Sequence, residues 1–177
     1  MIGADTFMLV FRLLHILAGM FWLGAASLTV LFLAPAAAEV GPAAGPLIAN
    51  LILKRRLARF VVGSGALTVV AGAVLYWRDW DRLYGSFGDF VGSEFGLAMT
   101  IGAIAAIGAL SIGASIVAPG MERAVRMAGE LARHGEPPTP EQADHLRAMQ
   151  MRTRRASRTT VALLWVAAAA MATARYW

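Results

Sequence analysis

Cysteine is absent from the 177-residue chain, and lysine occurs once, as Lys54. Without a thiol the protein can have no disulfide, cysteine-held iron–sulfur cluster, thiolate-ligated haem or covalently attached c-type haem. Four long apolar stretches also lack Asp, Glu and Lys in their interiors. They hold no carboxylate pair, no nucleophile beside a base and no phosphate-binding loop, so the sequence gives no basis for charged-solute transport or proton pumping.

Apolar residues make up 58% of the chain, whose mean hydropathy is +0.61. They are concentrated in four blocks, each of the roughly 17 to 25 residues that a helix needs to cross a bilayer. We therefore predict an all-α, single-domain integral membrane protein, a four-helix bundle surrounded by lipid. The expected helices are 7–35, 56–78, 95–119 and 158–177, with connections at 36–55 and 120–157. The first block is expected to remain as a spanning helix, because its apolar run is longer than that of a cleaved signal and no basic residue precedes it.

Basic residues predict how the helices are oriented. Of the sixteen Lys and Arg residues, four lie between residues 54 and 59 and eight between residues 123 and 158. The positive-inside rule places both of these connections in the cytoplasm and both termini outside. The net charge of +5 could also suggest nucleic acid, but we interpret the basic runs as anchors at the lipid surface and expect no nucleic-acid partner.

Short matches within the chain indicate a repeat. "KRRLAR" and "YW" flank the second block, and "RRASR" and "YW" flank the fourth at an offset of one hundred residues. Ala34-Pro35 in the first half matches Ala118-Pro119 in the second at an offset of eighty-four. The matches predict two parallel copies of a two-helix hairpin. The alternative is that they only reflect residue types that are common at membrane boundaries, such as Tyr-Trp pairs and basic residues.

The connections carry further signals. The segment "LIANLILKRRLARF" is expected to extend the second spanning helix into the cytoplasm. The run "HGEPPTP" should end one helix, and Thr139 is the expected N-cap of the next, which begins near Glu141. The loop "RDWDRLYGSFGDFVGSE" is aromatic and acidic, and we expect it to fold over the outer end of the bundle.

His15 is the residue that most invites a functional explanation. It lies within the first apolar block, where a polar ring is costly to keep. Met8, Gly19 and Trp22 share its helix face by spacing, and Met99 and Met171 are expected at a similar depth in the third and fourth helices. Imidazole and thioether together suit haem iron with His/Met ligation, or copper(I). The alternatives are a histidine hydrogen-bonded within the bundle and methionines that only fill space.

Each cofactor predicts its own residue set. For haem b, His15 and Met99 would be axial ligands, Gly19 would let the macrocycle approach, Trp22 would stack beside it and Arg12 would pair with a propionate. For copper(I), the soft-ligand set is His15, Met8, Met99 and Met171. A third hypothesis is a cofactor-free scaffold or accessory subunit in which His15 only bonds across helices. A homodimer and a membrane redox partner are further expectations.

Several of these stretches resemble a known family. His15, Trp22 and the following "LGAA", then "LFLAPAAAE" and "KRRLARFVVGSGALTVVAGAVLYW", are similar to the first two helices of the CopD-like membrane proteins. That group includes copper-resistance D proteins, the membrane part of a bacterial urate oxidase and HemJ-type protoporphyrinogen oxidases. The resemblance covers residues 9–78 well and the second half weakly, and it implies a protein of the bacterial cytoplasmic (inner) membrane.

The HemJ type also implies particular residue roles. Its histidine in the first helix, matched by His15, is associated with b-type haem, and a lysine in its third helix is important. The only lysine here is Lys54, and the aligned position in the third helix is Met99. The resemblance thus implies haem binding, and it leaves open whether the protein is an enzyme.

Overall fold

The computed structural model describes residues 2–134 and 139–176, and within these ranges the protein is helical with no strand. The helices are α1 (Ile2–Leu28), α2 (Ala34–Val40), α3 (Gly45–Ala49), α4 (Leu57–Leu83), α5 (Phe87–Gly92), α6 (Glu94–Ile112), α7 (Ala118–His134) and α8 (Pro140–Thr173). The described chain also contains three π-helical segments (Thr29–Leu33, Asn50–Lys54 and Gly113–Val117) and two 3₁₀ segments (Gly41–Ala44 and Ala174–Tyr176). The predicted all-α four-helix architecture is confirmed.

Four helical segments of the described chain are long and apolar enough to cross a membrane. Their bounds are Thr6–Lys54, Leu57–Leu83, Glu94–Arg133 and Pro140–Tyr176. Large apolar side chains cover their outer faces, among them Leu17 (63% exposed) and Ile104 (67% exposed). Such a surface would be unfavourable in water and is suited to hydrocarbon, so the structure is that of a multi-pass membrane protein.

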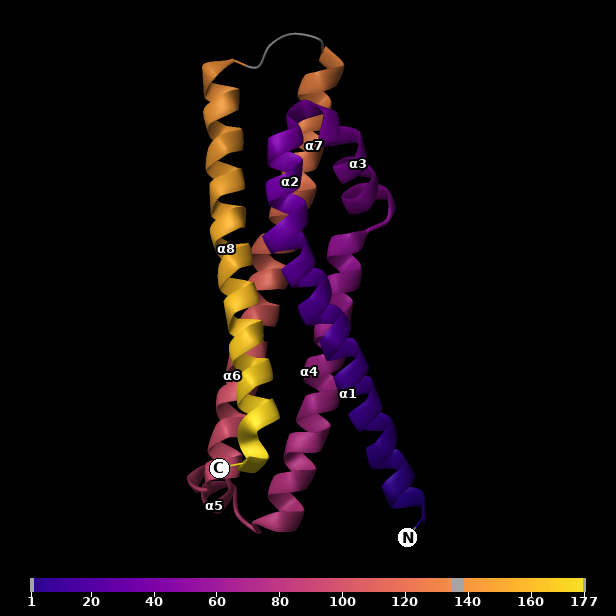
Figure 1. Ribbon diagram of the computed structural model, residues 1–177, viewed down its shortest axis with the longest axis vertical. Coiled ribbons are helices and arrows are strands. Elements are labelled where there is room, and N and C mark those ends of the chain that lie inside the picture. Colours follow the sequence, from indigo (N-terminus) through magenta and orange to yellow (C-terminus); the bar gives the residue numbers. More distant parts are fainter. Residues whose placement is uncertain (1, 135–138, 177) are drawn as a thin grey trace.

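The bundle is built from two hairpins. In one, α1 packs along α4, and in the other, α6 packs along α8. Figure 1 shows that α1 begins and α8 ends at the end of the bundle where α5 lies, while α2, α3 and the joined ends of α7 and α8 form the opposite end. Two crossings per hairpin return the chain to the same side, as parallel repeats require.

The two hairpins share an irregularity that follows the predicted repeat. The π-helical segments Thr29–Leu33 and Gly113–Val117 lie eighty-four residues apart, and each precedes an Ala-Pro pair, Ala34-Pro35 or Ala118-Pro119. Proline cannot donate to the helix ladder, and its ring clashes with the carbonyl four residues before it. A π-bulge shifts the ladder by one residue and lets each helix continue through its proline. This common structure supports the offset of eighty-four.

The connection after the first span differs from the prediction. Residues 45–54 do not extend α4, because Arg56 adopts a left-handed conformation with φ of 54° and separates the two segments. Instead, the first helix continues through α2 to Val40, Gly41 turns the chain at φ 71°, and α3 packs against α7. The expectation of a cytoplasmic extension of the second spanning helix is therefore wrong.

The remaining local signals agree with the structure. Thr139 caps α8 in a capping box: its hydroxyl accepts from the Gln142 backbone at 3.2 Å, and the Gln142 side chain accepts from the Thr139 backbone at 3.0 Å. The loop between α4 and α6 forms the short helix α5, whose Phe90 ring is 0% exposed. Phe90 packs edge-on against Tyr76 and Tyr84. The loop therefore packs against α6 and α4 at this end of the bundle, and its closure over the whole end stays a prediction.

Candidate functional site

His15 lies in the interface between α1 and α4. Its Nδ1 atom is 2.8 Å from the backbone oxygen of Thr68. A carbonyl oxygen only accepts, so Nδ1 carries the proton and donates it, and Nε2 keeps a lone pair. The ring can approach this closely because Gly72 has no side chain: a Cβ there would lie 2.7 Å from His15 Cε1. The imidazole is therefore fixed in orientation, with Nε2 available as an acceptor or ligand.

Gly19 and Trp22, on the same face of α1, are also covered by α4. A Cβ at Gly19 would lie 3.3 Å from Thr68 Cγ2, and a Cβ at Gly65 would lie 2.7 Å from Trp22 Cε2. Trp22 is only 4% exposed and belongs to a core cluster with residues of α6 and α8, including Ala105 and Leu164. This face of the helix holds the hairpin together and joins it to the second hairpin.

The contacts follow a simple antiparallel register. Along α1, His15, Gly19 and Trp22 are spaced by four and then three residues. Their respective partners on α4 are Gly72, Thr68 and Gly65, which have the same spacing in the opposite chain direction. Each large side chain of one helix faces a small residue of the other. Small residues such as Gly65 and Gly72 are expected to let membrane helices approach closely, but their pairing with this face of α1 and the role of Thr68 were not predicted, although the complementary spacing was a readable signal.

Two of the three candidate methionines, Met99 and Met171, lie on helices of the second hairpin. Met171 of α8 packs against α6, where a Cβ at Gly102 would lie 2.8 Å from its Cγ. Met99 is half-buried on α6, whereas α1 packs mainly on α4 and also touches α8. Within the described side chains, no hydrogen bond joins His15 to Met8, Met99 or Met171. No group of three or more His, Cys, Asp or Glu side chains in that part of the chain could hold a metal ion.

Arg12 lies one turn from His15 toward the N-terminal end of α1, as the sequence required. Its side chain is exposed, and it interacts electrostatically with Asp79 of α4. The guanidinium therefore already has a carboxylate nearby.

Tyr76 and Thr100 form a polar connection between the two hairpins. Thr100 of α6 donates its hydroxyl proton to the backbone oxygen of Gly96 at 2.6 Å. The hydroxyl groups of Tyr76 and Thr100 are 2.7 Å apart, and since the proton of Thr100 is already committed, Tyr76 is the donor. The chain of hydroxyl groups joins α4 to α6 one turn from Gly72. The repeated Tyr-Trp pair that contains Tyr76 gave no sign of this hydrogen bond, because its partner lies on another helix.

Comparison of the chain with family models, curated proteins and solved structures gives no match. The fold and the site therefore define the class alone: a four-helix membrane protein in which a buried interface orients one histidine. The CopD-like resemblance remains a prediction.

Proposed function

We propose that the protein binds a b-type haem within the membrane, with Nε2 of His15 as an axial ligand, and has a redox or electron-transfer role. The observation that supports this is the Nδ1 hydrogen bond to Thr68. Histidines that bind metals almost always donate their other ring N–H to a carbonyl or carboxylate, which fixes the tautomer and raises the basicity of the ligating nitrogen. His15 has this arrangement before any metal is considered.

The residues around His15 fit a haem only in part. His15 itself fits, but Gly19 and Trp22 do not form a cradle for the macrocycle, because Thr68 and Gly65 already cover them. Of the residues expected around a haem on this helix face, only His15 therefore keeps a role in holding it. When bound, it would supply one-electron redox chemistry, and this chain would supply the oriented imidazole and a low-dielectric surrounding.

The proposal also includes a second axial ligand, a partner for a haem propionate and the location of the protein in the cell. Met99 is the candidate for the other axial position, from this chain or from the second copy in a homodimer, and Arg12 is the candidate partner of a propionate. We place the protein in a bacterial inner membrane with both termini outside, next to a redox partner. The arginine-rich connections support this orientation, since they lie toward the end of the bundle opposite the two chain termini (Figure 1).

A cofactor-free scaffold is the second candidate, and the same hydrogen bond favours it. A bond from Nδ1 to a carbonyl across two helices is itself a reason to keep a histidine in a membrane, where it contributes about 0.6 to 2 kcal/mol. The copper(I) alternative has less support, because Met171 packs in the α6–α8 interface.

Two substitutions of His15 separate these functions. An asparagine amide can donate from a position near that of Nδ1, so His15→Asn should keep the bond to Thr68 but remove the ligand. His15→Ala removes both. If His15 is a haem ligand, both variants lose the haem absorption while only His15→Ala loses the interhelical bond. If the role is structural, wild type purified from haem-replete cells has no haem spectrum, and His15→Asn keeps the stability that His15→Ala loses.

A further inference from the structure

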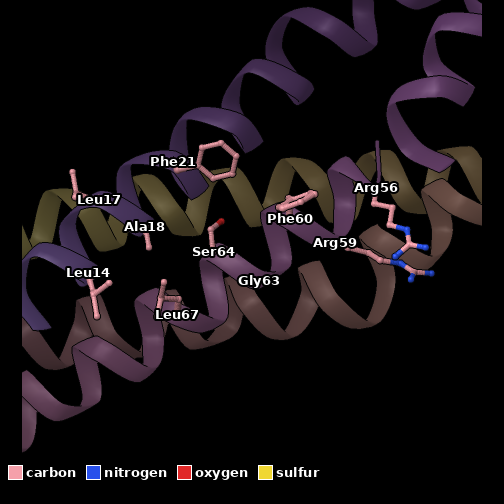
Figure 2. Close-up of a pocket in the computed structure, with 10 residues that line it drawn as sticks. All are labelled: Leu14, Leu17, Ala18, Phe21, Arg56, Arg59, Phe60, Gly63, Ser64 and Leu67. Atoms are coloured by element: carbon pink, nitrogen blue, oxygen red, sulfur yellow. The ribbon is translucent and has the colours of Figure 1, made fainter. Parts of the chain in front are cut away.

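A groove runs along the surface between α1 and α4, and His15 is not among its lining residues. Its volume is about 640 Å³, and its lining includes Leu14 and Leu17 of α1 and Arg56, Arg59, Gly63 and Leu67 of α4. Figure 2 shows the two arginines together at one end and the leucines at the other. The groove is thus apolar along most of its length and basic at one end.

The charged end is positive overall. Arg59 Nε lies 3.1 Å from a carboxylate oxygen of Glu122, so one of the two groove arginines has an acidic partner. Arg56, Arg59 and Arg126 all act electrostatically on this same carboxylate. Three guanidinium groups around one carboxylate leave net positive charge beside the groove, and Arg56 is exposed. This end can therefore attract an anion from outside the chain.

The length of the groove corresponds to one leaflet. From Arg56 to Leu67 is eleven residues along α4, or about 16 Å at 1.5 Å per residue. The hydrocarbon core of a bilayer is about 30 Å thick. The groove therefore reaches from the basic interface to roughly the middle of the membrane, which is the extent of one lipid molecule.

We propose that this groove binds an anionic phospholipid, with its phosphate at Arg56 and Arg59 and an acyl chain along the apolar lining. Basic pockets between membrane helices are suited to acidic headgroups. The apolar walls match a hydrocarbon chain, and Gly63 leaves space for it, since a Cβ there would meet nothing within 4 Å. The lipid would contact both α1 and α4 along the groove.

Native mass spectrometry of the full chain in mild detergent tests this site. Phosphatidylglycerol and phosphatidylcholine with identical acyl chains are the probes, and the first should be retained preferentially. Arg56→Gln should weaken phosphatidylglycerol binding by about fivefold, the expected effect of one arginine near the membrane surface. Arg55→Gln is the matched control, because Arg55 is exposed but does not line the groove.

A second pair of variants tests the apolar part. Gly63→Leu should fill the groove and lower retention of both lipids, whereas Gly24→Leu, also at a glycine with nothing within 4 Å, should not. Equal retention of the two lipids, equal losses in Arg55→Gln and Arg56→Gln, or displacement of the lipid by inorganic phosphate would each overturn the proposal. Because His15 does not line the groove, these variants should leave any haem spectrum unchanged.

Discussion

Replacing Gly65 with alanine should destabilise the α1–α4 hairpin. The added Cβ would lie 2.7, 2.9 and 3.0 Å from Cε2, Cζ2 and Cδ2 of Trp22. Carbon atoms in contact are normally about 3.5 to 4.0 Å apart, so the overlap with the ring is close to 1 Å. Trp22 is 4% exposed and held by the core cluster, so the ring cannot move aside freely.

The magnitude follows from two opposing effects. Overpacking of a well-packed interior costs about 1 to 3 kcal/mol, while the better helix preference of alanine returns about 1 kcal/mol. Gly63→Ala is the matched control on the same helix: it has the same gain in helix preference, and its Cβ would meet nothing within 4 Å. The two variants should therefore differ by about 1 to 3 kcal/mol in their free energy of unfolding.

The assay is equilibrium unfolding in mixed micelles of mild detergent and dodecyl sulfate. Gly65→Ala should unfold at a lower dodecyl sulfate fraction than wild type, and Gly63→Ala at a higher one. Trp22→Leu should reduce the cost of Gly65→Ala, because the clashing ring is gone. Equal midpoints for the two alanine variants would refute the packing of Trp22 on Gly65.

Three further predictions concern other parts of the bundle. Phe90→Ala should lower the free energy of unfolding by about 3 kcal/mol, because Phe90 is fully buried, whereas Phe87→Ala, at a ring 50% exposed, should cost clearly less in the same assay. Arg56→Gly should raise the stability by about 1 kcal/mol by relieving the left-handed backbone, and Arg55→Gly, at φ −81°, should lower it; a gain for both would contradict this explanation. Tyr76→Phe should lower the free energy of unfolding by about 0.6 to 1.7 kcal/mol through loss of the hydroxyl bond to α6. An unchanged free energy of unfolding would show that this bond does not stabilise the bundle.

The sequence could predict the four spanning helices because apolar length is a strong and local signal. The Thr139 cap was predictable for the same reason, since a capping box lies within four consecutive residues. The break at Arg56 was not, because arginine carries no preference for the left-handed conformation and neither glycine nor proline marks the position. The pattern of residues 45–60 is helical throughout, and the segment before the break packs against α7, a contact between distant parts of the sequence.

Of the candidate site, only the residues on α1 were predicted from the sequence. Spacing alone placed His15, Gly19 and Trp22 on one helix face, and the structure confirms that all three face α4. The residues of α4 that cover this face are determined by the register between the two helices. The spacing of residues within one helix carries no information about that register. Gly19, expected to admit a macrocycle, meets the side chain of Thr68 instead.

The most direct test of the haem proposal is the visible absorption spectrum of the full chain, purified in mild detergent from haem-replete cells, before and after reduction with dithionite. If His15 binds haem, wild type and Gly63→Leu should show a Soret band, with α and β bands that sharpen on reduction, and His15→Asn should lose all of these bands. A featureless spectrum in folded wild type, or haem bands that persist in folded His15→Asn, would contradict His15 as the ligand.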